Sequence, residues 1–181
     1  LVCVAEGYDL MSLVEPQLVS SDKQDWETPL WLYRELNDEF GFMLDAAASF
    51  HNFKCGRYFT EKDDALSRSW NVTVFGTPCP VFVNPPYGRG IKQWTEKAYA
   101  EAMNNNCVVA MLTFARTDTS WWHEHVMRAS EVRLIRGRIR FESNGVPADY
   151  PAPAPSCVVI WTPWAKGAPT FSAMERNNGR M

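Results

Sequence analysis

No long hydrophobic run occurs in the sequence. Apolar stretches such as Val81-Phe82-Val83 and Cys107 to Leu112 fall far short of the roughly 20 residues that a membrane-spanning helix needs. The sequence also does not open with a charged segment followed by an apolar one, which is the pattern of a secretory signal. We therefore expect a soluble protein inside the cell, without a membrane contact.

Paired cysteines are missing as well. The five cysteines are odd in number and scattered, no CxxC pair occurs, and only Cys55 has a histidine, His51, near it. His123 and His125 stand two apart on a predicted helix, which points them to different faces. Neither a disulfide framework nor a metal site is expected.

The chain has no excess of positive charge, since its formal net charge is -3. Proteins that bind nucleic acids usually carry a basic surface, so any such surface here must be local. Five arginines within thirteen positions are the best candidates: Arg128, Arg133, Arg136, Arg138 and Arg140. The last three alternate along a predicted strand and would share one face, which suits contacts with phosphates. A solvated basic edge is the alternative that charge alone leaves open.

The length of the chain limits its organisation. A chain of 181 residues, 46% of them hydrophobic, is long enough for one core and too short for two. Residues 1–24 show no sustained period and predict a partly ordered N-terminal arm. The domain is expected over residues 25–163, and the polar residues 164–181 predict a frayed tail.

Helical and strand patterns alternate along the chain from residue 42 onward. Thr28 and Pro29 predict the cap and first turn of a helix that Gly41 ends. The predicted helices cover residues 28–41, 63–70, 91–102 and 122–129, and the predicted strands cover 42–45, 57–60, 72–75, 81–83, 107–112, 132–134 and 157–161. Residues 146–155 carry four prolines and predict a loop. This alternation predicts an α/β fold with a mostly parallel sheet of about seven strands and helices on both faces.

The tetrapeptide Asn84-Pro85-Pro86-Tyr87 is the candidate catalytic centre. It directly follows a predicted central strand, so it lies at a carboxyl end, where open α/β sheets bind their ligands. An amino group that attacks a methyl sulfonium needs two acceptors, and the Asn84 side-chain oxygen and the Pro85 carbonyl supply them. Tyr87 offers a face for stacking a base outside its duplex. The alternative is a tight, proline-rich turn without catalytic function.

The tetrapeptide resembles the catalytic loop of S-adenosylmethionine-dependent amino-methyltransferases. That loop also serves enzymes that act on RNA guanine and on protein glutamine, so the order of the surrounding segments is more specific. In this order the chain resembles the phage N6-adenine DNA methyltransferase family over roughly residues 25–163. The segments that carry the resemblance, besides the tetrapeptide, are Trp26-Glu27-Thr28-Pro29, Leu44 to Ser49, Cys55 with Tyr58-Phe59-Thr60, Asp64-Ala65-Leu66 with Trp70, Trp94, Arg116 to Thr119 with Trp121, Gly137 to Phe141 and Pro155 to Val159.

The resemblance implies a single Rossmann-like methyltransferase domain with S-adenosylmethionine as its cofactor and DNA as its partner. The implied reaction is direct transfer of the methyl group to the exocyclic amino group of a flipped adenine. The implied location is the cytoplasm of a bacterial host, and no obligate protein partner is evident. Adenine rather than cytosine, and DNA rather than RNA, depend on the resemblance alone.

Asp45 ends the first predicted strand, where its carboxylate can face the positive amino-acid end of the cofactor or orient the turn that wraps it. A helix-capping or turn aspartate is the alternative. The small residues Ala46 and Ala47 permit a close backbone approach to the cofactor. No glycine occurs between Gly41 and Gly56, although methyltransferases prefer glycines in this turn.

Further cofactor contacts follow from the resemblance. Asp64 corresponds to a segment that contacts the cofactor in related enzymes, although the sequence does not separate it from Asp63, and a helix-capping function is equally open. Thr28 and Pro29 resemble the segment that folds over the methionine end. Trp26 stacks there or packs.

Two rival functions stay open at this point. One is a methyltransferase for RNA or protein nitrogen, which would keep the loop and the fold but change the substrate surface. The other is a catalytically idle nucleic-acid-binding protein with the same fold, against which the intact Asn84, Pro85 and Tyr87 argue.

Overall fold

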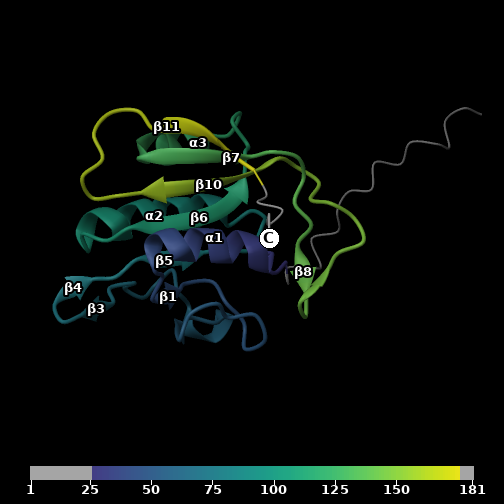
Figure 1. The fold of residues 1–181 in the computed structure, drawn as a ribbon. Helices are drawn as coiled ribbons and strands as arrows, with labels where there is room; N and C mark the ends of the chain where they lie inside the picture. Colours follow the sequence, from purple (N-terminus) through teal and green to yellow (C-terminus); the bar gives the residue numbers. More distant parts are fainter. Residues whose placement is uncertain (1–25, 176–181) are drawn as a thin grey trace, which may run out of the picture.

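A seven-stranded sheet forms the centre of the computed structural model, which describes residues 26–175. Figure 1 shows the arrangement of its elements. The strand order is β11-β7-β10-β6-β5-β1-β2. The bounds are β1 Leu44–Asp45, β2 Arg57–Tyr58, β5 Val81–Val83, β6 Val109–Phe114, β7 Glu131–Ile135, β10 Ser156–Trp161 and β11 Thr170–Met174. Strand β10 runs antiparallel to its neighbours β6 and β7, whereas the other neighbouring pairs are parallel. The predicted mostly parallel sheet is confirmed.

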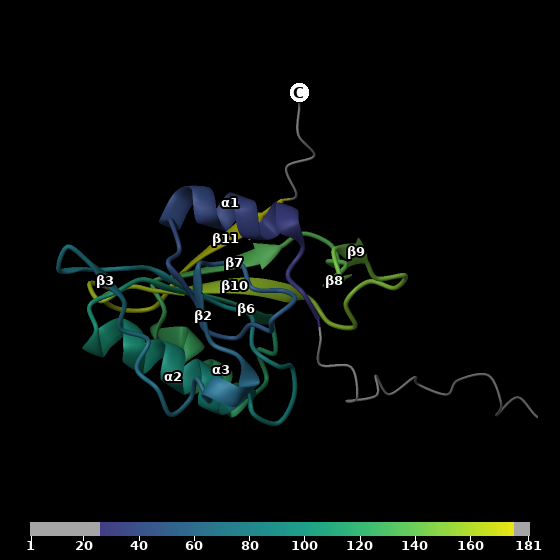
Figure 2. The same ribbon diagram turned by 90° about the horizontal axis from the view of Figure 1, so that it is seen from below.

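Helices cover both faces of this sheet (Figure 2). Helix α1 (Leu30–Phe40) lies on one face, and α2 (Ile91–Asn104) and α3 (Ser120–Glu124) lie on the other. Successive strand residues point to opposite faces, so Ala110 and Leu112 join the cluster under α1 while Val109 and Met111 join the cluster under α2. Because both faces are covered, every residue of β6 and of β10 is buried.

Helix α1 shows why the local pattern predicts its element. Leu32 and Leu36 are fully buried on its inner side, and Gly41 ends it in the left-handed region at φ 66°, where its N–H donates to the Asn37 carbonyl. The predicted cap at Thr28 is wrong. The helix begins at Leu30, one residue later than a cap at Thr28 predicts, and its N-cap residue, Pro29, forms no side-chain capping bond.

Three short elements differ from the prediction. Residues 63–70 do not form a helix, because a single 3-10 turn, η1 (Glu61–Asp63), ends at Asp64 with φ 50°. The predicted edge strand 72–75 lies outside the main sheet, where β3 (Thr73–Val74) and β4 (Thr77–Pro78) form a separate hairpin. The helix expected over 122–129 divides into α3 and a 3-10 turn, η2 (Val126–Arg128).

A second hairpin follows strand β7. It consists of β8 (Glu142–Ser143) and β9 (Val146–Pro147), joined by a turn at residues 144 and 145 (Figure 2). The predicted loop over 146–155 is therefore wrong in its first two residues. Pro147 is tolerated in β9 because this short strand pairs with β8 on one side only.

The sheet continues past the expected end of the domain. Residues 170–174 form β11, parallel to β7, with Met174 buried, so a frayed tail is wrong for these residues. The predicted arm over 1–24 lies outside the described residues. Within residues 26–175, no helix has both the length and the apolar composition to cross a membrane.

Candidate active site

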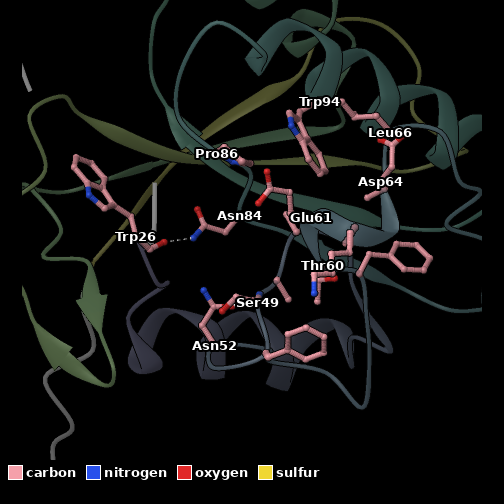
Figure 3. Close-up of a pocket in the computed structure, with 17 residues that line it drawn as sticks. Trp26, Ser49, Asn52, Thr60, Glu61, Asp64, Leu66, Asn84, Pro86 and Trp94 are labelled. Carbon is pink, nitrogen blue, oxygen red and sulfur yellow. Dashed lines mark hydrogen bonds between the residues drawn. The ribbon is translucent and has the colours of Figure 1, made fainter. Parts of the chain in front are cut away.

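A cavity of about 410 Å³ lies at the carboxyl ends of β1, β2 and β5. These parallel strands end at the same edge of the sheet, so the loops that follow them meet there. The lining residues come from these loops, from α2 and from the segment before α1 (Figure 3). They are Trp26, residues 46–50, Asn52, residues 59–62, residues 64–66, Asn84, Pro86 and Trp94.

Six of the eleven predicted site residues outside the arginines line this cavity, and five do not. The lining ones are Trp26, Ala46, Ala47, Asp64, Asn84 and Pro86. Four of the others are buried and do not line the cavity: Thr28, Pro29, Asp45 and Pro85. Tyr87 also does not line it and packs among aromatic rings. The loops that carry the predicted residues thus meet at one cavity, but only some of the predicted side chains line it.

Asp45 orients the turn that follows β1. One carboxylate oxygen accepts the Ala47 N–H at 3.3 Å, and the other accepts the Lys54 N–H at 3.0 Å. Its side chain is almost fully enclosed, and this burial raises the pKa of Asp45 to about 6 despite both bonds. The geometry agrees with the second function expected for this carboxylate, the shaping of the turn.

The Asn84 amide has a defined orientation. Its Nδ2 donates to the Trp26 carbonyl at 2.7 Å (Figure 3), and its Oδ1 accepts the Tyr87 hydroxyl at 2.9 Å. An amide has a donor end and an acceptor end, so the carbonyl partner selects the nitrogen end and leaves the oxygen on the other side. A carbonyl oxygen accepts two hydrogen bonds, so Oδ1 can accept a second donor besides Tyr87.

Tyr87 belongs to a cluster of four aromatic rings. Its ring centroid lies 4.4 Å from that of Phe114, 5.4 Å from Phe141 and 5.9 Å from Trp26. Trp26 and Phe141 also touch, with centroids 4.9 Å apart. Burial in this cluster raises the pKa of Tyr87 well above its ordinary value, so the hydroxyl stays protonated and donates. The partner residues of Tyr87 were not predicted, because they come from three distant segments.

The structure distinguishes Asp63 from Asp64, which the sequence did not separate as cofactor contacts. Asp63 accepts the Thr60 N–H at 2.9 Å and the Thr60 hydroxyl at 2.8 Å, which closes the η1 turn and lowers the pKa of Asp63. Asp64 lines the cavity instead (Figure 3). Glu61, which the sequence reading missed, stands beside it as a second carboxylate. Glu61 follows shortly after the carboxyl end of β2, and this position in the sequence could have predicted that it lines the cavity.

The arginines do not form the predicted strand face. Strand β7 ends at Ile135, and Gly137 turns the chain at φ 77°. Arg136 pairs with Glu175 at 2.7 Å, Arg138 donates to the Ala152 carbonyl at 3.2 Å, and Arg140 donates to the Ala148 carbonyl at 3.1 Å. All three side chains are exposed. The other two arginines of the set, Arg128 and Arg133, contact Tyr99 and the carboxylates of Glu39 and Glu131, respectively.

The sheet, the cavity at its carboxyl edge and the Asn-Pro-Pro-Tyr turn together define an α/β methyltransferase of the class that acts on amino or amide nitrogens. Residues 15–180 match the family described as DNA N-6-adenine-methyltransferase (Dam), and the chain belongs to this family. The resemblance found in the sequence is confirmed.

Two curated relatives carry the same description. The DNA N-6-adenine-methyltransferase of Haemophilus phage HP1 (strain HP1c1) is 31% identical over 127 residues, which cover 68% of this chain and 69% of the phage protein. The DNA N-6-adenine-methyltransferase of Escherichia phage T1 is 31% identical over 121 residues, which cover 66% of this chain and 48% of that protein. The match thus spans about half of the T1 protein.

Proposed function

We propose that this chain transfers the methyl group of S-adenosylmethionine to the exocyclic N6 amino group of adenine in DNA. Family membership supports adenine and DNA. The observation that carries the chemistry is the Asn84 amide, which is held by the Trp26 carbonyl at the carboxyl end of a central strand and at the rim of the cavity. Its position suits an acceptor for an amino group.

The cavity suits the proposed cofactor. Its volume of about 410 Å³ lies within the range of small-molecule sites. The carboxylates of Glu61 and Asp64 offer acceptors for hydroxyl and amino hydrogens, and Phe59 and Trp94 offer aromatic surface. The alanines at 46 and 47 leave backbone accessible close to the strand end. When bound, S-adenosylmethionine supplies a methyl group on a positively charged sulfur.

The residues of the turn hold the amino group that is methylated. Oδ1 of Asn84 and the Pro85 carbonyl accept its two hydrogens, which stabilises the positive charge that develops on nitrogen. The nitrogen lone pair forms the new bond to the methyl carbon as the carbon–sulfur bond breaks, and the extra proton leaves the nitrogen for water. No side chain of the protein forms a covalent bond in this scheme.

The target base must leave the duplex to reach Asn84. Tyr87 donates its hydroxyl to that amide, and its ring packs against Phe114. We assign to Tyr87 the stacking of the extruded base. The strand order, with β10 inserted antiparallel between β6 and β7, further supports a Rossmann-like methyltransferase fold.

Nucleoside analysis of modified DNA tests the proposal. DNA from cells that express this chain should contain N6-methyladenine, and DNA from cells that express Asn84→Ala should contain little. Methylation found only in RNA or in protein would support the first rival function. Binding of S-adenosylmethionine without methylation of any polymer would contradict catalysis.

A further inference from the structure

Two segments far apart in the sequence hold one another beside the catalytic turn. We call residues 26–30 the strap and β8–β9 the hairpin. The backbones of Glu27 and Glu142 exchange hydrogen bonds of 3.0 and 2.9 Å, and the Leu30 N–H donates to the Glu142 carboxylate at 3.2 Å. Phe141, next to the hairpin, packs on the Trp26 ring. The strap therefore depends on the hairpin for its position.

The buried side chain at the centre of this contact is Glu27. Its carboxylate accepts the N–H groups of Asn144 at 2.8 Å and of Gly145 at 3.4 Å, and the residue is only 7% exposed. These two N–H groups belong to the turn of the hairpin, where φ is 52° and 75°. The central residues of a two-residue turn have no strand partner for their N–H groups, so Glu27 supplies the missing acceptor. A buried carboxylate needs such partners in return.

The strap ends at the catalytic amide. Trp26 directly precedes Glu27, and its carbonyl accepts Nδ2 of Asn84 at 2.7 Å. The peptide that joins Trp26 to Glu27 is therefore fixed on one side by the hairpin and contacts Asn84 on the other. If this peptide moves, the Asn84 amide loses the partner that keeps its oxygen turned toward the substrate.

We propose that Glu27 is a positioning residue for methyl transfer, acting through the Trp26 carbonyl on the Asn84 amide. The proposal deepens the proposed function, because it rests on Asn84 as an acceptor for the amino group. It assigns to the hairpin turn a part in catalysis without contact with the cofactor or the base.

The kinetic test compares Glu27→Ala and Glu27→Gln with the control Glu124→Gln, an exposed glutamate that pairs with Lys92. A small displacement of a catalytic group costs up to about 100-fold in rate, so Glu27→Ala should lower kcat about 10-fold to 100-fold. The KM for DNA and the Kd for S-adenosylmethionine should stay near their normal values. Glu27→Gln keeps one acceptor oxygen and should recover most of the rate.

A double-mutant cycle tests whether the effect passes through Asn84. In an Asn84→Ala background, Glu27→Ala should cause no further loss of kcat. An equal loss in both backgrounds, or a normal kcat for Glu27→Ala, would overturn the proposal. A loss confined to cofactor affinity would overturn it as well.

A measurement on the free protein separates this proposal from the proposed function. The side-chain amide signals of Asn84, assigned by their absence in Asn84→Ala, should shift in the nitrogen–proton NMR spectrum of folded Glu27→Ala. Folded Glu27→Leu, which also lacks both acceptor oxygens, provides the same readout if the alanine variant does not fold, whereas Glu27→Gln should leave the signals near their normal positions. Unchanged signals in Glu27→Ala or Glu27→Leu refute the positioning role even if the chain methylates adenine. Shifted signals support it even if the substrate is another amino group.

Discussion

The Asn84 side chain has its nitrogen and its oxygen engaged by different partners, the Trp26 carbonyl and the Tyr87 hydroxyl. This fixes which end of the amide faces a substrate. The residue type alone does not reveal either of these two partners. Asparagine at this position is predicted by the motif, whereas its orientation depends on a residue 58 positions away.

Removing the Asn84 side chain should affect the chemical step. Asn84→Ala deletes one of two acceptors for the developing charge, and the loss of one preorganised partner costs on the order of 100-fold to 1,000-fold in kcat. Cofactor affinity should be retained. Single-turnover rates and calorimetry measure the two effects, with Asn71→Ala as an exposed control. A normal rate for Asn84→Ala contradicts the mechanism.

Substitutions of Tyr87 should separate stacking from hydrogen bonding. Tyr87→Ala removes a stacking face worth roughly 1 to 3 kcal/mol per base, so capture of the extruded base should weaken. Tyr87→Phe keeps the ring and its contacts with Phe114, and loses only the hydroxyl's bonds to Asn84 and to the Leu112 carbonyl, so it should be tolerated. A fluorescent base analogue at the target position reports extrusion directly. If Tyr87→Phe is as inactive as Tyr87→Ala, the hydroxyl and not the ring is essential.

Asp45 should make stability depend on pH. Burial raises its pKa to about 6, above the value of 3.8 for an ordinary aspartate, so the folded state binds the proton more tightly than the unfolded state. This group's contribution to the free energy of unfolding should therefore be greatest below the ordinary value and fall as pH rises to about 6. Urea unfolding at several pH values, compared with Asp45→Asn, measures the difference. A pH-independent difference between the two proteins would contradict the assignment.

Among the secondary-structure elements, long periodic segments agree with the prediction and short ones do not. Helices α1 and α2 and strands β6 and β10 carry enough apolar residues to define their type. The segments at 63–70 and 136–140 contain helix-like or strand-like spacing, but a left-handed residue, Asp64 or Gly137, interrupts each of them. Hydrophobic spacing does not report backbone turns of this kind.

The segment after β7 remains the candidate for phosphate contacts, with two of its arginines exposed and bound only to backbone carbonyls. Replacing both Arg138 and Arg140 by alanine should lower DNA affinity for all sequences. The plot of log affinity against log salt concentration should become less steep, by up to about 0.9 per lost phosphate contact. Fluorescence anisotropy at several salt concentrations measures both. Arg34→Ala, on the exposed side of α1, is the control. An unchanged affinity and slope would place DNA elsewhere.

At the level of the whole molecule, two hydrophobic clusters on opposite faces of one sheet support the site at its edge. The cluster under α1 includes Phe82, and the cluster under α2 includes its neighbours Val81 and Val83. Strand β5 is therefore packed on both faces directly before Asn84. The Asn-Pro-Pro-Tyr turn, which we propose to be catalytic, thus directly follows a strand that is packed on both faces.

The C-terminal strand should contribute to this whole-molecule stability. A chain that ends after Pro163 lacks β11, which removes its pairing with β7 and the buried Met174. Its Tm should fall by several degrees, because an unpaired β7 then forms the edge of the sheet. Thermal unfolding, with a chain that ends after Glu175 as control, measures this. An equal Tm for the two chains would instead agree with a domain that ends at residue 163.

The sequence by itself determined the alternation of helices and strands, the position of the Asn-Pro-Pro-Tyr turn after a central strand and the family. These depend on neighbours along the chain, on hydrophobic spacing and on short motifs. Only the tertiary structure decided that β10 runs antiparallel, that Asp45 faces a turn, and that Glu27 binds a hairpin 117 residues away. Such contacts arise when distant segments pack on a common core, and no local pattern of residues records which segments will meet.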